Sequence, residues 1–222
     1  GAEVPLYAHL SMILGDDGQK LSKRHGAVSV MQYDEQGYLP EAVLNYLARL
    51  GWSHGDDEIF SLQQFCEWFD LDHITASAAQ FNTDKLNWLN AHYLKRAGTA
   101  RLAELVRPRL QARGVNVGTI PSLTAIVDLY KERAGNLNEL ADMAEVFYID
   151  LHPKAELLAK HLTAEALPVL GEFIDRLPEV AWEAAAIGGL IKDCVTRHGL
   201  KMPRLAMPLR VLLTGLEQTP SV

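Results

Sequence analysis

The sequence predicts a mostly α-helical protein, built of helical bundles that follow a short segment of strands and loops. From Leu39 onward, apolar residues recur every three or four positions, which is the spacing of amphipathic helices. Serine, threonine or asparagine precedes several of these stretches, where its side chain can cap a helix. Residues 1–14 lack this spacing and favour one or two strands. So short a strand pair cannot bury its apolar face alone, and we expect it to pack on the helices or to belong to a larger domain.

Start and stop signals place the first helices. Pro40 stands where a first-turn proline is tolerated, and Gly51 can end that helix. Ser61–Gln64 has the form of a capping box. Asn82, or the threonine after it, can cap the next helix, which carries Trp88. We expect the aromatic side chains of these helices to lie in the core.

Three further helices are predicted between residues 98 and 153. Thr99 can cap a helix that extends to Arg113 and is bent by Pro108. Ser122 can cap a second helix that ends near residue 134, and residues 137–148 have the pattern of a third.

The last part of the chain predicts a second helical group. A long alanine-rich helix is expected from about Glu179 to Arg197, and the glycine pair at 188–189 either weakens it or admits a close neighbour. Pro208 can start a last helix, Leu209–Thr214.

Charge is distributed unevenly along a chain whose net charge is -7. Gln32–Asp84 holds ten acids and one base, whereas Lys95–Arg113 holds six bases and one acid, and Lys192–Arg210 holds five bases and one acid. An acidic body with separate basic segments can bind a polyanion only along chosen surfaces. Charge alone, however, favours the simpler interpretation that these bases coat exposed helix faces.

The cysteines and histidines predict no metal site. Cys66 and Cys194 are the only cysteines, and no histidine or cysteine group has the spacing of metal ligands. We expect two small buried thiols in a reduced, cytoplasmic setting, with neither a membrane span nor a secretory leader. His54 and His92 are expected to be structural hydrogen-bond donors rather than catalytic bases.

A basic loop lies between two glycine-bearing turns. Lys20, Lys23 and Arg24 place three cations within five residues, and Ser22 lies among them. Mobile ammonium groups can follow the charge of a polyanion as it moves during a reaction. The loop lacks the Gly-x-x-x-x-Gly-Lys pattern of P-loop proteins. Taken alone, a short basic loop is more typical of a solvated turn.

The frame around this loop is specific. The string from Ala8 to Gly26 resembles the "KMSKS" signature loop of class I aminoacyl-tRNA synthetases, and in detail that of bacterial glutamyl-tRNA synthetases. Leu21 stands in place of the methionine of the motif, and Arg24 in place of its final serine. Later stretches resemble the same family: Gly37–Ala42, Asn45–Leu47, Leu50–Trp52, Phe81–Asn90 and Met207–Arg210.

The resemblance implies that the chain is part of a glutamate–tRNA ligase, which activates glutamate with ATP and transfers it to tRNA(Glu). It implies that Lys23 is the main cation on the ATP phosphates, that Lys20 assists it, and that Ser22 is a further ATP contact. ATP would be used with Mg²⁺, and we expect no metal to be held by this chain. Negative charge grows on the leaving pyrophosphate, and a positioned ammonium group stabilises it.

The resemblance also implies a division of the chain. We expect the edge of the catalytic domain with its loop, a helical domain that contacts the tRNA stem, and two anticodon-binding bundles at residues 1–30, 31–97, 98–160 and 161–222, respectively. Arg133 and Arg210 match arginines that read anticodon bases, and Thr219 matches a polar contact nearby.

Two features of the family are not found in the sequence: the His-x-Gly-His type motif and the glutamate pocket. We therefore expect a monomeric C-terminal fragment that does not activate glutamate by itself. A non-enzymatic helical module that binds RNA or a protein is the alternative, but it would have no use for the Lys20 loop. Glutaminyl-tRNA synthetase has β-barrels in its anticodon region, which the helical periodicity opposes. A paralogue that glutamylates a tRNA base lacks the anticodon bundles.

Overall fold

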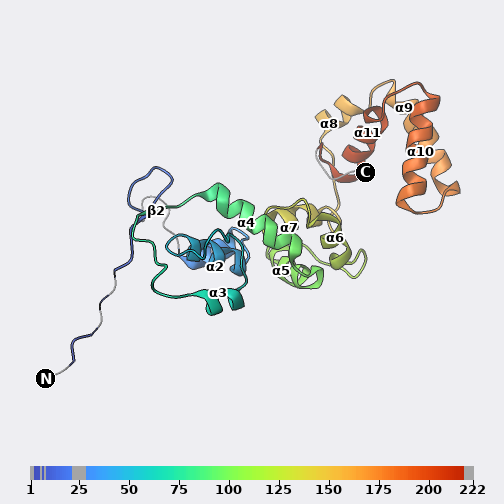
Figure 1. The fold of residues 1–222 in the computed structure, drawn as a ribbon. Helices are drawn as coiled ribbons and strands as arrows, with labels where there is room; N and C mark the ends of the chain where they lie inside the picture. The colour runs from blue at the N-terminus through green and yellow to red at the C-terminus, as the bar shows by residue number, and fades with distance from the viewer. Residues whose placement is uncertain (1–2, 6, 8, 22–28, 218–222) are drawn as a thin grey trace. The chain divides into compact units, whose positions relative to one another are not determined.

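The computed structural model describes residues 3–5, 7, 9–21 and 29–217. The chain forms two compact units, Gly1–Glu145 and Val146–Val222. Helices dominate both, as predicted, and the described residues contain one small sheet (Figure 1). The first unit contains β1 (Ile13–Leu14), α1 (Val30–Glu35), α2 (Pro40–Arg49), α3 (Leu62–Trp68), β2 (Ala79–Gln80), α4 (Thr83–Arg96), α5 (Thr99–Ala112), α6 (Leu123–Tyr130) and α7 (Leu137–Glu145). The second contains α8 (Ala155–His161), α9 (Ala166–Arg176), the 3-10 helix η2 (Leu177–Glu179), α10 (Ala184–Arg197) and α11 (Pro203–Thr214).

The two short strands pair in parallel, with Ile13 opposite Ala79. Both of these residues pack against a core cluster of α2 and α4, formed by Tyr46, Leu50, Leu86 and Leu89. Most described residues before Ile13 are exposed, and among them no strand forms. The strand predicted within residues 1–14 is therefore limited to the two residues that lie against the helices, because an unpacked strand pair is not stable.

Local capping signals are confirmed at three helices. Pro40 is the first residue of α2. Ser61 and Gln64 form the predicted capping box at α3, with the Gln64 N–H donating to Ser61 Oγ at 3.1 Å. Asn82 caps α4, where its Oδ1 accepts the Lys85 N–H at 2.9 Å. The starts of α3 and α4 depend on side-chain contacts three residues apart, which can be read directly from the sequence.

The helices around α5 differ in detail from the prediction. Thr99 is the first residue of α5 rather than its cap, which is Gly98. The Thr99 hydroxyl instead donates to Asp128 Oδ1 on α6 at 2.9 Å, so a tertiary contact competes with the local one. Ser122 precedes α6 but makes no side-chain capping bond. α6 ends at Tyr130 and α7 at Glu145, about four and three residues earlier than expected, respectively.

Two predicted helix starts in the second unit are wrong. The alanine-rich helix α10 begins at Ala184 and not near Glu179, because Val180 is extended and packs against the core of this unit. The last helix, α11, begins at Pro203 rather than after Pro208. A proline at the first helical position loses no hydrogen bond, whereas Pro208 is carried inside the helix, where it is buried.

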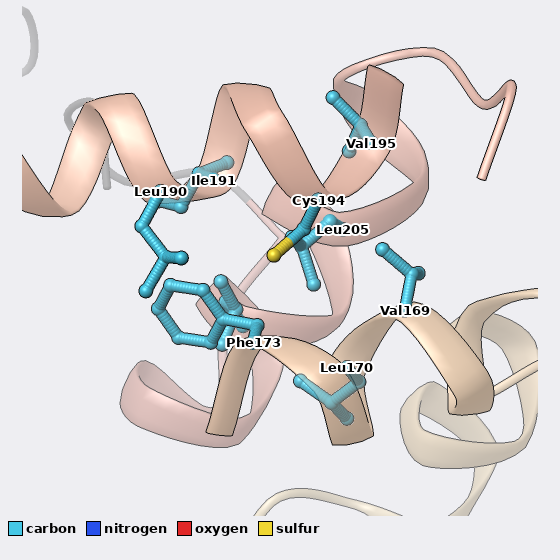
Figure 2. Packing of buried hydrophobic residues seen from close by; sticks show 9 residues of the cluster. Val169, Leu170, Phe173, Leu190, Ile191, Cys194, Val195 and Leu205 are labelled. Atoms are coloured by element: carbon cyan, nitrogen blue, oxygen red, sulfur yellow. The ribbon is translucent and has the colours of Figure 1, made fainter. Parts of the chain in front are cut away.

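The predicted burial of Cys194 is confirmed, whereas the predicted burial of Cys66 and of Trp88 is wrong. Cys194 is buried in the core of the second unit, among Val169, Leu170, Phe173, Leu190, Ile191, Val195, Leu205 and Leu209 (Figure 2). Cys66, on the short helix α3, is exposed. Trp88 is 50% exposed because Leu86, Leu89 and Asn90 occupy the buried face of α4.

Asn90 is a fully buried polar residue that connects three segments of the first unit. Its Oδ1 accepts the N–H of Leu39, just before α2, at 2.8 Å. Its Nδ2 donates to the C=O of Gly135, in the turn between α6 and α7, at 2.7 Å. Each backbone group thus keeps a partner away from water.

We predict that Asn90→Leu destabilises the first unit by about 2–5 kcal/mol, because it leaves the buried N–H of Leu39 and the C=O of Gly135 without partners. The measurement is urea unfolding followed by tryptophan fluorescence. Lys95→Ala, an exposed change on the same helix, is the control and should cost less than about 0.5 kcal/mol. Equal midpoints for both variants would show that the Asn90 bonds do not hold these segments.

Candidate functional site

The described part of the basic loop begins as a tight hairpin. The Leu21 N–H donates to the Ile13 C=O at 2.9 Å, and the Gly15 N–H donates to the Gln19 C=O at 2.7 Å. Gly18 has a φ of 74°, a conformation that favours glycine, and it closes the turn. Lys20 forms an antiparallel backbone bridge with Leu14, and Lys20 is exposed to solvent. Ser22, Lys23 and Arg24 lie outside the described residues.

The hairpin is anchored to the helical part of the first unit through Asp16. The Gln80 side chain donates to the Asp16 C=O at 2.8 Å, and the Thr83 hydroxyl donates to the Asp16 carboxylate at 3.1 Å. Thr83 is the first residue of α4. The start of the basic loop and the start of α4 are therefore held together, although more than 60 residues separate them in the chain.

Half of the basic residues in the segment Lys95–Arg113 form salt bridges with other helices of the first unit. Their salt bridges connect α5 to α2, α1 and α7: Arg101 to Glu41, Arg109 to Asp34, and Arg113 to both Asp142 and Glu145. The hydrogen bond with Glu41 raises the pKa of the Arg101 guanidinium, so this arginine stays charged. These three arginines hold the fold together and are not free for an outside anion.

Arg133 is different, because it is exposed and available. It lies in the turn between α6 and α7, where its N–H donates to the Tyr130 C=O at 2.9 Å. Among the described residues, its guanidinium has no hydrogen-bond or ion-pair partner. The neighbouring Lys131, by contrast, is held by Thr99 and Asp128.

The turn that carries Arg133 is rigid. Asn136 Oδ1 accepts the N–H groups of Asn138 and Glu139 at the start of α7, and the Glu139 carboxylate accepts the N–H of Gly135 at 2.7 Å. Asn90 holds the same turn from the core side. The turn fixes the backbone position of Arg133, from which its exposed planar donor group can reach an outside acceptor.

Arg210 is half-buried in the third turn of α11, and not beside a helix start as expected. Its Nη1 lies 3.3 Å from Met207 Sδ and 3.4 Å from the C=O of Glu217. Its Nε is buried and has no hydrogen-bond partner among the described residues. A buried donor without a partner is uncommon in folded proteins.

The predicted base-reading residues do not lie within one compact unit. Arg133 belongs to the first unit and Arg210 to the second. Thr219 lies outside the described residues. The structure thus describes two separate candidate contacts, one on each unit.

Sequence reasoning missed a cluster of positive charge in the second unit. A cavity of about 280 Å³ lies against α8 and α11 and is lined by Lys160, His161, Thr163, Lys201, Pro203, Arg204, Met207 and Pro208. The relevant signal was present in the basic segment Lys192–Arg210, but Lys160 and His161 come from an element 40 residues earlier. Only the packing of α8 on α11 brings them together.

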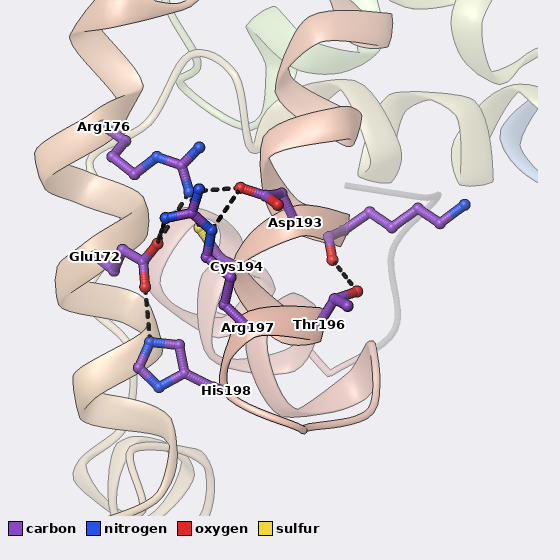
Figure 3. Close-up of polar contacts among 8 residues, drawn as sticks. Glu172, Arg176, Asp193, Cys194, Thr196, Arg197 and His198 are labelled. Atoms are coloured by element: carbon purple, nitrogen blue, oxygen red, sulfur yellow. Dashed lines mark hydrogen bonds and ion pairs between the residues drawn. The ribbon is translucent and has the colours of Figure 1, made fainter.

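A second charged cluster in this unit is closed upon itself (Figure 3). Glu172 pairs with Arg176 at 2.9 Å and with His198 at 2.8 Å. Asp193 pairs with Arg176 at 2.7 Å and with Arg197 at 3.1 Å. Hydrogen bonds from His198 and Arg176 lower the pKa of the Glu172 carboxyl. These contacts join α9 to α10. Because the charged side chains pair with one another, the cluster offers few unpaired charges to a ligand.

The described residues contain neither a candidate membrane span nor a candidate metal cluster. No helix in that part of the chain is long and apolar enough to cross a membrane. No group of three or more histidine, cysteine, aspartate or glutamate residues there could hold a metal ion.

Comparisons with known proteins match both ends of the chain. Residues 1–88 match the family model "tRNA synthetases class I (E and Q), catalytic domain", and residues 101–222 match "Anticodon binding domain". A glutamate–tRNA ligase of Dechloromonas aromatica is 68% identical over the whole chain, and one of Azoarcus sp. is 65% identical. The chain covers 48% of each of these relatives, so it spans about half of their length.

A solved structure agrees with these matches. The glutamate tRNA ligase of Elizabethkingia meningosepticum, in complex with its amino acid, superposes with a TM-score of 0.84 at 29% identity. The superposition covers 99% of this chain and 48% of that one.

The Glu172 cluster makes the second unit sensitive to acid. Because folding lowers the pKa of Glu172 below its usual 4.5, its contribution to stability is complete above that pH and is lost as the pH falls through the lowered value. We predict that Glu172→Gln lowers the melting temperature at pH 7 and that the difference from the wild type shrinks once the pH falls below the usual 4.5. Calorimetry at both pH values measures this. Asp175→Asn, on the same helix and without an ion pair, is the control. A deficit that is equally large at both pH values would contradict the assignment.

Proposed function

This chain belongs to the glutamyl-tRNA synthetase family of class I synthetases, and from that premise we propose that it acts in glutamate–tRNA ligation, as the part that supplies the ATP-phosphate loop and the tRNA-binding surfaces. The main support for this proposal is that the two family models match successive parts of one chain. A glutamate–tRNA ligase is also 68% identical to this chain. The described geometry supports the proposal at Arg133, which is exposed and unpaired on a rigid turn.

In the proposed reaction, glutamate attacks the α-phosphate of ATP, pyrophosphate leaves, and the glutamyl group passes from the adenylate to the terminal ribose of tRNA(Glu). The products are glutamyl-tRNA, AMP and pyrophosphate. ATP would be bound with Mg²⁺. We assign Lys23 as the main cation on the phosphates, with Lys20 and Ser22 as further contacts. Charge builds up on the leaving pyrophosphate, and a positioned ammonium group stabilises it more in the transition state than in the ground state.

The hairpin geometry gives Lys20 a defined role in this proposal. Its backbone pairs with Leu14, so its position relative to the Asp16 anchor is fixed. Lys23 follows three residues later. The anchored hairpin would thus set where the phosphate-binding part of the loop starts.

We further propose that residues 1–30 form the edge of the catalytic domain, that residues 31–97 contact the tRNA stem, and that residues 98–160 and 161–222 bind the anticodon. Arg133 and Arg210 would each hydrogen-bond or stack on an unpaired anticodon base, and Thr219 would add a polar contact. The chain would act in the cytoplasm as a monomer.

The first test of this function concerns Lys23. In a chimera in which this chain replaces the matching part of a curated relative, Lys23→Ala should slow adenylate formation by about 10²–10³-fold. Glutamate affinity should change little, because the lysine faces phosphates. The measurement is glutamate-dependent ATP–pyrophosphate exchange with titration of glutamate. If glutamate binding collapses while the activation rate survives, the assigned role of Lys23 is wrong.

The second test concerns base reading by Arg133 and Arg210. Each Arg→Ala change should cost about 1–3 kcal/mol in tRNA recognition and relax discrimination against altered anticodons, because a base-specific contact is lost. A phosphate contact would instead weaken all tRNAs alike. The measurement is the affinity of the chain for tRNA(Glu) and for transcripts with substituted anticodons.

Arg96→Ala is the matched control, since Arg96 is also exposed and unpaired in the first unit. It should leave the preference among anticodons unchanged. Should both arginine variants keep the wild-type preference, base reading by Arg133 and Arg210 must be given up.

A further inference from the structure

The positively charged cavity between α8 and α11 has a wall in common with Arg210. Met207 lines the cavity, and its Sδ is the atom that contacts Arg210 Nη1 at 3.3 Å. Pro208, two residues before Arg210, lines the cavity as well. A ligand group in the cavity would therefore lie next to whatever Arg210 binds.

Two of the cations around the cavity are available. Lys201 is exposed and has no ion pair or hydrogen bond from its ammonium group among the described residues. Arg204 faces Glu165 only at 3.8 Å, and both side chains are more than half exposed, so this pair is weak. Thr163 adds a hydroxyl group to the lining.

The other two basic residues share a single internal carboxylate. Lys160 Nζ and His161 Nε2 each lie 2.6 Å from Glu217 Oε1. These hydrogen bonds, with that of Lys160 the larger influence, lower the pKa of the Glu217 carboxyl, so this group stays ionised. One anionic oxygen is thus already bound at the edge of the cavity, in a place where two donors converge.

We propose that this cavity binds a phosphodiester group of the tRNA backbone, next to the nucleotide that Arg210 contacts. Lysine and arginine donors with a hydroxyl group are the usual partners of RNA phosphates. A volume of about 280 Å³ accommodates a phosphate together with part of its sugar, whereas a flat surface would hold neither. The proposal rests on the function proposed above and assigns Lys201 and Arg204 as the phosphate contacts.

Glu217 has an opposing role in this proposal. Its carboxylate pairs with Lys160, contacts the His161 ring and repels an incoming phosphate. The site has three permanent cations, Lys160, Lys201 and Arg204. The carboxylates of Glu165 and Glu217 offset two of these charges, so the site is only weakly positive. A change of one charge therefore has a large relative effect on anion binding.

The test is binding of tRNA(Glu) by the complete 222-residue chain as a function of salt. Lys201→Gln and Arg204→Gln should each weaken binding about 5–20-fold at low salt and make the slope of log K against log salt shallower by about 0.7–0.9. Anticodon preference should not change, since phosphates carry no sequence information. Glu217→Gln should tighten binding instead, by about 3–10-fold. Lys192→Gln, an exposed and unpaired lysine on α10, is the matched control and should have no effect.

Phosphate ethylation interference gives an independent readout. Ethylation at one or two phosphates of the anticodon arm should block the wild-type chain, and Lys201→Gln should abolish the block at those phosphates only. An ethylation pattern identical to that of the wild type would overturn the proposal. A second combination of results would also overturn the proposal: NMR shows that the cavity binds inorganic phosphate, but Lys201→Gln and Arg204→Gln leave the affinity for tRNA unchanged.

The outcomes separate this inference from the proposed function. If the wild-type chain binds tRNA and the cavity variants bind equally well, only the cavity assignment fails. If the wild-type chain does not bind tRNA, both fail. A Glu217→Gln variant with unchanged circular dichroism and no gain in affinity would contradict the opposing role of that carboxylate.

Discussion

The buried amide of Asn90 is the interaction on which the arrangement of the first unit depends. With one oxygen and one nitrogen it satisfies backbone groups of two distant segments, the start of α2 and the turn before α7. Gly37 secures the same junction: its C=O accepts the Leu137 N–H at 2.9 Å, and a Cβ there would lie 2.8 Å from the Asn138 nitrogen. Its φ of 85° also favours glycine. The turn that presents Arg133 is thus fixed by the Asn90 amide and by the close approach of Gly37 to the start of α7.

Ion pairs decide which of the basic residues can serve an outside partner. Most arginines of the α5 segment, and those of the Glu172 cluster, form salt bridges with neighbouring helices. Arg133 in the first unit and Lys201 in the second are among the cations that stay unpaired in the described part of the chain. A chain with net charge -7 can therefore attract RNA at separate points while the rest of its surface repels it.

The anchor at Asp16 connects the two proposed activities of the first unit. The hairpin that leads into the basic loop is hydrogen-bonded to Gln80 and Thr83, at the start of a helix proposed to lie beside the tRNA stem. Displacement of α4 would be transmitted to the loop through a carboxylate and a carbonyl group, rather than through a flexible linker. Fixed geometry of this kind is what positioning of phosphates requires.

The sequence by itself determined the helical class, the start of α2 and the caps of α3 and α4, because proline at a first turn and a side chain bonded three residues ahead are local interactions. It also indicated the family, through the frame of the basic loop. Tertiary structure alone decided that α11 begins at Pro203, that Cys66 and Trp88 face outward, and that Arg210 is half-buried. It alone formed the cavity at Lys201, since α8 and α11 are far apart in the chain. Burial and charge pairing depend on which surfaces meet, and such non-local contacts have no periodic trace in the sequence.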